Sequence, residues 1–324
     1  MKKIFLLCTL LLMVSGFAAA QEKSNRELRA DEYFAVFNYP AAINGYSGAK
    51  DLSNDGLRKL AVSYHKTHQE MEAEEAYVRL STVEAFTAED HFDYSMVLKA
   101  NGKTTDARRQ LDLFAAKLPN DLRAKSYRTT GESLAALSKE NGRYTITHPE
   151  INTTANDYAP GYYKNQLTFA SDRSGAKLIV RKYNWTGRPF GDIYAAEIKG
   201  ETLKKPGNFS RKLNGVLHDG PVSFNEKGDF IAFTRNAINT KKSDEVVTIQ
   251  IWFSYFLAGQ WSDPIPFNQN SKTHSVGHPF LTADGQTLYF TSDMPGGFGG
   301  TDLYKVSRIP EGDWGAPVNL GNTV

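Results

Sequence analysis

The chain repeats a sixteen-residue phrase, and this repeat constrains its fold more strongly than any other feature. The copies occupy residues 157–172, 219–234 and 278–293. Their prolines, Pro160, Pro221 and Pro279, are 61 and 58 residues apart. Within each copy, short stretches of alternating apolar and polar residues are separated by turns that contain Gly or Asn. A repeat of this length and pattern predicts one β-propeller blade per copy.

Each copy is expected to supply four strands. In the last copy we expect them at residues 279–281, 287–291, 302–306 and 317–320. In the middle copy we expect them at residues 222–224, 230–234, 248–256 and 262–266, and in the first copy only 166–170 and 192–198 are clear. Three blades are fewer than the four or more of a closed propeller. The chain is then a fragment, a truncated gene product, or an arc completed by a partner.

Residues 21–119 have the apolar period of helices and contain a second repeat. Pairs of small residues recur twelve positions apart: Ala30 and Ala42, Ala61 and Ala73, Ser95 and Ala107. Small side chains let two helices cross closely, and large residues such as Tyr33, Tyr46, Tyr64 and Tyr77 fill the space beside them. This spacing resembles the tetratricopeptide (TPR) pattern of stacked helix pairs. An ordinary helical bundle is the alternative.

TPR stacks are interaction surfaces, and their concave face is lined by first-helix residues that point away from the small-residue seam. Here the resemblance assigns that groove to Glu27, Asp31, Arg58, His65, Lys66 and Lys99. A groove of mixed charge would hold a peptide or a neighbouring domain. The alternative is that these side chains form ordinary solvated helix faces.

The first twenty residues have the features of a secretory signal peptide. Lys2 and Lys3 precede an apolar stretch at 4–17, and alanines at 18–20 form a cleavage site. A retained N-terminal anchor is the alternative. Cleavage would remove Cys8, the only cysteine, and with it disulfides and cysteine-ligated metals. It would also lower the number of basic residues from 38 to 36, which equals the number of acidic residues. A net charge of zero argues against nucleic-acid binding.

Two segments join the helical and strand-rich regions. Residues 120–143 are polar and are expected to form a connector, with a short helix near 132–139. Residues 144–147 alternate like a strand that precedes the first blade.

Several short motifs resemble those of TolB-type, WD40-like propellers. They are Phe169-x-Ser171-Asp172, Asp302-Leu-Tyr304 and the longer run at 291–304. With the signal peptide and the TPR-like repeats, they resemble OmpA-family envelope proteins of bacteria that use type IX secretion or gliding. The resemblance implies an exported protein at the periplasmic face of the outer membrane, with envelope proteins as partners. It assigns peptidoglycan binding to a C-terminal domain that is absent from these residues.

Candidate chemical motifs are weak. The glycines of 296–300 lack the Gly-Lys-Ser/Thr ending and the following helix of a phosphate-binding loop. His65, His68 and Glu70 do not have the His-Glu-x-x-His spacing of a zinc peptidase. We therefore expect no catalytic residue, cofactor or metal site.

Residues 178–190 form an insertion between two strands of the first blade. It carries a basic and aromatic cluster: Arg181, Lys182, Tyr183, Trp185 and Arg188. Such clusters are enriched at binding interfaces. The alternative is a plain extra hairpin whose aromatic residues pack on the blade.

The sequence thus predicts a multidomain α + β chain. Residues 1–20 are a signal peptide, 21–119 a TPR-like helical stack, 120–143 a connector, and 144–324 an incomplete, three-blade WD40-like propeller. The expected function is a non-enzymatic scaffold for protein–protein interactions in the cell envelope. Alternatives are a propeller module that binds a glycan or a peptide, or a hydrolase accessory.

Overall fold

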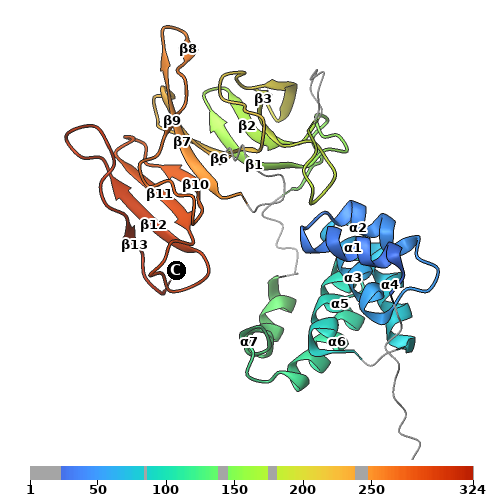
Figure 1. Cartoon of the computed structure of the whole chain (residues 1–324). Helices are drawn as coiled ribbons and strands as arrows, with labels where there is room; N and C mark the ends of the chain where they lie inside the picture. Colours follow the sequence, from blue (N-terminus) through green and yellow to red (C-terminus); the bar gives the residue numbers. More distant parts are fainter. Residues whose placement is uncertain (1–22, 84–85, 138–144, 174–180, 238–246, 324) are drawn as a thin grey trace, which may run out of the picture. The chain divides into compact units, whose positions relative to one another are not determined.

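The computed structural model describes residues 23–83, 86–137, 145–173, 181–237 and 247–323. The chain divides into two compact units, residues 1–129 and 130–324 (Figure 1). The expected signal peptide at 1–20 lies outside the described residues. None of the helices in the described part is long and apolar enough to cross a membrane.

The first unit is built from three consecutive helix pairs followed by the first half of one more helix, which continues past residue 129 (Figure 1). The pairs are α1 (Asn25–Ala35) with α2 (Tyr39–Ser47), α3 (Asn54–Lys66) with α4 (Glu70–Val83), and α5 (Ala88–Ala100) with α6 (Thr104–Lys117). The second helix of one pair also contacts the first helix of the next. The expected helical repeat is therefore present as helix pairs.

The predicted small residues lie where the paired helices cross. All six are fully buried. In the first pair the approach is so close that a Cβ on Gly45 would lie 2.6 Å from the Cβ of Ala30. Tyr46 and Tyr77 fill the space beside the crossings and are fully buried. Tyr33 was expected to do the same, but it is 44% exposed, so that prediction is wrong.

The first helix of each pair begins at a side-chain cap. Ser24 accepts a hydrogen bond from the Glu27 amide at 3.2 Å, and Ser53 accepts one from Gly56 at 3.0 Å. Thr87 accepts one from the Asp90 amide at 3.1 Å. The Asp90 carboxylate in turn accepts a hydrogen bond from the Thr87 backbone N–H, which completes a capping box. Each cap satisfies a backbone donor that a helix start leaves free, and each contributes about 1 kcal/mol.

The segment after the pairs differs from the expected connector. Instead of a short helix at 132–139, α7 spans Leu122–Leu137. Its buried Ala124 packs with Leu111 and Phe114 of α6, which explains why a polar sequence is helical here. The strand expected at 144–147 is absent from its described residues 145–147, where Ile146 is 95% exposed and has no core to pack on.

The second unit contains three antiparallel sheets in its described residues (Figure 1). The first sheet is β1 (Asp157–Tyr163), β2 (Gln166–Ser171), β3 (Asp192–Lys199) and β4 (Thr202–Asn208). The second is β5 (Asp219–Phe224), β6 (Phe230–Asn236), β7 (Ile249–Leu257) and β8 (Gln260–Trp261), with β9 (Ile265–Pro266) also paired to β7. The third is β10 (Val276–Leu281), β11 (Thr287–Ser292), β12 (Asp302–Ser307) and β13 (Val318–Asn319). The strand predictions are confirmed, except that the strand expected at 262–266 is replaced by the two short strands β8 and β9.

The three prolines of the repeated sequence phrase share one structural position, which is an irregularity in the first strand of each sheet. The pairing register shifts between Tyr158 and Gly161, between Asp219 and Val222, and between Gly277 and Phe280. Proline has no backbone N–H to donate to a ladder, so it is tolerated where a bulge interrupts the pairing. The repeated phrase therefore marks a repeated bulge.

Successive sheets pack face to face. β5 contacts β1, β2 and β3 of the first sheet, and β10 contacts β5, β6 and β7 of the second. The interface between the second and third sheets buries Phe253, Phe267, Phe290 and Trp314. Side chains alternate between the two faces of a strand. The second sheet, which packs on both of the others, therefore contributes side chains to one core on each of its faces.

Candidate functional site

Glu27, the first residue assigned to the helical groove, is fully buried. Its carboxylate accepts hydrogen bonds from the backbone N–H of Ser53, at 3.2 Å, and from the Ser53 hydroxyl. Ser53 is the N-cap of α3, so Glu27 fixes the start of the next helix pair. The prediction that Glu27 lines an open groove is therefore wrong.

Asp31 is the centre of an ion-pair cluster between α1 and α3. Lys23 Nζ lies 2.5 Å and Lys59 Nζ 2.8 Å from its carboxylate, and the Tyr46 hydroxyl donates to it at 2.7 Å. Burial alone would raise the pKa of Asp31, but the hydrogen bonds from Lys23, Lys59 and Tyr46 hold it at about 2. The same cluster raises the pKa of Lys59 against the opposing effect of burial.

The other assigned groove residues are Arg58, His65, Lys66 and Lys99. Arg58 Nε donates to the Asp90 carboxylate of α5 at 2.7 Å, and His65 Nδ1 lies 2.8 Å from Glu70 Oε2. Lys66 and Lys99 are exposed on the surface. Most of the predicted set therefore joins helices to one another instead of lining an open surface.

A hollow of about 610 Å³ lies among α4, α5 and α6. One wall is aromatic: the ring of Phe86 lies 5.3 Å from that of His91 and 5.9 Å from that of Tyr94. His91 Nδ1 lies 2.7 Å from Gln110 Oε1, and both residues line the hollow. Asp106 and Arg109 also line it, and both are exposed without a hydrogen bond or ion pair to another described residue.

The same hollow recurs one helix pair earlier. A smaller hollow of about 160 Å³ lies among α2, α3 and α4. Residues that line the two hollows correspond at a constant offset of 34 positions, as in Leu52 and Phe86, Leu60 and Tyr94, Tyr64 and Leu98, Glu75 and Arg109. The hollow is thus a property of the helical repeat. We will call the pair the repeat hollows.

The sequence reasoning missed the repeat hollows because it placed the binding face on the first helices. Phe86 lies in a short loop and Arg109 on a second helix, and neither has a motif around it. The 34-residue offset was visible in the sequence and would have related Leu60 to Tyr94. The hollow itself depends on how far neighbouring second helices stand apart, which sequence spacing does not fix.

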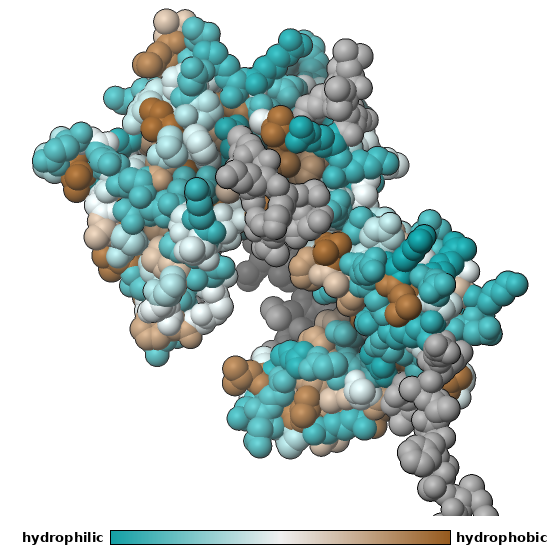
Figure 2. All heavy atoms as spheres, in the orientation of Figure 1, coloured by the Kyte–Doolittle hydropathy of each residue, from teal (hydrophilic) through white to brown (hydrophobic). Residues whose placement is uncertain are grey.

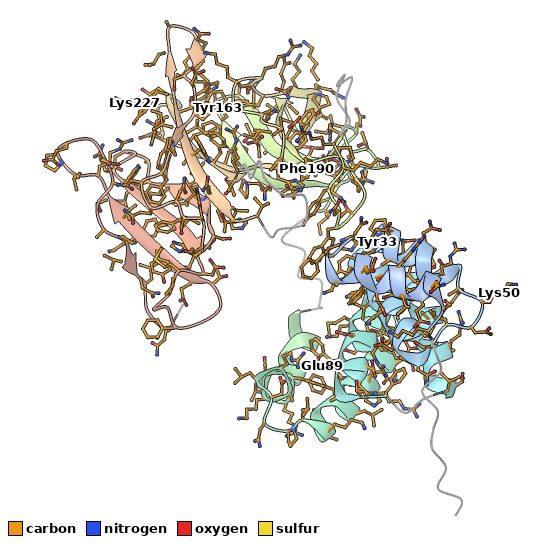
Figure 3. All side chains as sticks on the ribbon, in the orientation of Figure 1. Tyr33, Lys50, Glu89, Tyr163, Phe190 and Lys227 are labelled. Atoms are coloured by element: carbon orange, nitrogen blue, oxygen red, sulfur yellow. The ribbon has the colours of Figure 1, made fainter. Side chains whose placement is uncertain are left out.

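The described part of the insertion between β2 and β3 packs against the end of β2 and against His218, which directly precedes β5 of the second sheet. Arg188 donates to the Asp172 carboxylate at 2.6 Å, and the ring of Tyr183 lies 4.8 Å from that of His218. Tyr183 also contacts Phe190, which is labelled in Figure 3. Trp185 is partly buried, whereas Arg181 and Lys182 are exposed. These contacts agree with the alternative that the insertion is an extra hairpin whose aromatic residues pack on the neighbouring sheet. Residues 178–180 of the insertion lie outside the described residues.

The glycine-rich run at 296–300 is closed by its own chain. The backbone N–H groups of Phe298 and Gly299 donate to the Asp302 carboxylate at 2.8 and 3.1 Å. A carboxylate thus occupies the donors that a phosphate-binding loop would offer. Among the described residues no group of three or more His, Cys, Asp or Glu side chains could hold a metal ion.

The visible surface contains no single large apolar area. Figure 2 shows hydrophobic residues as small separate patches among hydrophilic ones.

No protein-family model and no curated protein matches the chain. Among solved structures, it is similar to the first TPR of Spaghetti (RPAP3) bound to the HSP90 peptide SRMEEVD. The two share 18% identity at a TM-score of 0.31, over 34% of this chain and 90% of that one. It is also similar to an α-L-arabinofuranosidase from Lactobacillus brevis, with 15% identity and a TM-score of 0.32 over 55% of this chain and 61% of that one. Both TM-scores are too low for either likeness to establish the fold.

Proposed function

We propose that the chain is a non-enzymatic scaffold whose helical repeats hold peptide segments of partner proteins in the repeat hollows. The observation that carries this proposal is the recurrence of the hollow at a 34-residue offset. A single hollow is common on protein surfaces. Two hollows at equivalent positions of successive helix pairs provide consecutive binding positions for one extended peptide segment.

The chemistry of the larger hollow favours a polypeptide. It offers an aromatic wall at Phe86 and Tyr94 for an apolar side chain. Beside that wall, Asp106 and Arg109 offer charges of both signs without partners in the described chain. A peptide carries apolar, acidic and basic groups at short spacing, so it can satisfy all three features at once.

The proposal extends to architecture and location. The three stacked sheets, each with a proline bulge in its first strand, are blades of a WD40-like propeller, and the helix pairs are TPR-like. The sequence resemblance to OmpA-family envelope proteins supports export to the periplasm and association with the outer membrane, beside a type IX secretion or gliding complex. The partners would then be envelope proteins.

Peptide selection by phage display against the purified full chain tests the binding function. We expect enriched peptides that combine an apolar residue with charged ones. Replacing Asp106 and Arg109 together by Ala should weaken their binding about tenfold, since both charged contacts are lost. Both side chains are exposed, so the fold should be unaffected.

Arg108→Ala is the matched control, because Arg108 is an exposed arginine of the same helix that does not line the hollow. It should leave peptide affinity unchanged. If no peptide is enriched, or if binding survives the double substitution, the repeat hollows are not the binding site and the proposal is wrong.

A further inference from the structure

We propose that a second hollow, between the first and second sheets, binds an acidic saccharide. This inference is independent of the helical repeats and goes beyond the scaffold function. The hollow has a volume of about 600 Å³, within the range of small-ligand sites. It is formed by the β1–β2 turn, by the end of β4 with residues 209–212, and by the β7–β8 turn. We will call it the inter-sheet hollow.

Aromatic rings from three separate segments line the inter-sheet hollow. The rings of Tyr163 (labelled in Figure 3) and Phe209 lie 5.1 Å apart. That of Trp261 lies 6.0 Å from Tyr163 and 5.4 Å from Phe256. Tyr163 and Trp261 are more than nine-tenths buried and belong to the core beneath the hollow, where they hold the other two rings in place. Phe209 and Phe256 are only half-buried, so their rings are the ones a ligand can reach. Rigid rings provide flat apolar surfaces, the kind on which the C–H face of a sugar ring packs.

The charged residues that line the hollow are all positive. They are Lys205, Arg211 and Lys212, and no Asp or Glu is among the lining residues. Lys205 lies 3.7 Å from Glu197, and Lys212 lies 3.5 Å from the highly exposed Asp263. Arg211 is exposed and has no partner in the described chain. Arginine binds carboxylate and sulfate groups through two parallel hydrogen bonds, so this rim favours an anion.

Amide side chains supply the remaining polar groups. Gln166, Asn208 and Gln260 line the hollow, and none of their side chains makes a hydrogen bond within the described residues. An amide both donates and accepts, which matches the hydroxyl groups of a sugar. An acidic peptide would pair with the cations and, through its backbone, with the amides, but its carboxylate side chains have no flat apolar face to pack on the rings. The combination of rings, free amides and an unpaired arginine therefore favours an acidic saccharide over an acidic peptide.

Titration calorimetry on the purified full chain tests this assignment with three probes: trigalacturonate, the neutral trisaccharide maltotriose, and hexaglutamate. We expect trigalacturonate to bind most tightly, and its affinity to fall as salt is added. Arg211→Gln should weaken it about tenfold, since a charge-assisted hydrogen bond is lost. Gln260→Ala should weaken it by a smaller factor.

Lys305→Gln is the matched control, since it removes another exposed positive charge, from the third sheet, and should leave trigalacturonate affinity unchanged. If maltotriose binds as tightly as trigalacturonate, the claim that the cationic rim selects an anionic ligand is wrong. If hexaglutamate binds more tightly than trigalacturonate, the ligand is an acidic peptide and the saccharide assignment is wrong. Absence of trigalacturonate binding at millimolar concentration, or binding unaffected by Arg211→Gln, would overturn the site itself.

Discussion

At the scale of single residues, the charged side chains of the helical unit act mainly on one another. Asp31 contacts Lys23, Lys59 and Tyr46, which belong to three different segments. Because the folded pKa of Asp31 is about 2, below its ordinary value of 3.8, the folded chain binds this proton more weakly than the unfolded chain. The resulting stabilisation is present above about pH 4 and is lost as the pH falls toward 2.

We therefore expect Asp31→Asn to lower the free energy of unfolding by about 1 kcal/mol at pH 7, after allowance for solvent screening. The difference from wild type should shrink as the pH falls from about 4 to about 2. Urea denaturation at several pH values measures it. Glu32→Gln, at an exposed neighbouring position of α1, should have no such effect; a constant difference at all pH values would show that the charge of Asp31 is not responsible.

The sequence predicted that Glu27 and Asp31 face a groove, and it did not predict their partners. Their partners Ser53 and Lys59 come from the next pair, 26 and 28 residues away. Helical period describes one helix alone, so it could not show that the following pair would cover Glu27 completely.

At the scale of elements, small residues and proline determine how neighbours meet. A methyl group at Gly45 would overlap Ala30, which lies on the facing helix. The spacing of Ala30 and Ala42 in the sequence predicted this crossing. The closeness required at Gly45 was not predictable, since glycine inside a helix also signals a turn.

Gly45→Ala should destabilise the helical unit by about 1–3 kcal/mol, because the crossing helices must move apart. Asn44→Ala, at the adjacent exposed position, provides the comparison and should be close to neutral. Thermal unfolding followed at the helical circular-dichroism band measures both. A stabilised Gly45→Ala would mean that the gain in helix propensity outweighs the overlap and that the contact is looser than described.

At the scale of the whole molecule, two repeat types account for the two units. Strand positions in the second and third sheets were predictable because alternating apolar residues are bounded by Gly and Asn turns. The outer strands of the first sheet were not clear in the sequence: β4 contains Lys204, Lys205 and Pro206, with no apolar alternation. Its position follows from pairing with β3, a contact that local sequence does not encode.

The stacking of sheets predicts a contrast between two phenylalanines of the third sheet. Phe290 is 1% exposed and faces the second sheet, whereas Phe280 is 62% exposed. Phe290→Ala should cost about 3–5 kcal/mol of stability through the cavity that it leaves, and Phe280→Ala less than about 1 kcal/mol. Denaturation monitored by tryptophan fluorescence compares them. Similar losses for the two variants would contradict the face-to-face packing.

The 34-residue correspondence between the repeat hollows also bears on how such a protein can evolve. Each hollow is enclosed by three consecutive helices and shares one of them, α4, with its neighbour. Duplication of a single helix pair would therefore create one additional hollow and leave the existing ones intact. Each duplicated gene segment would add one hollow, so the length of peptide that the protein holds would increase in discrete steps. The number of binding positions would change while the contacts within each hollow stay the same.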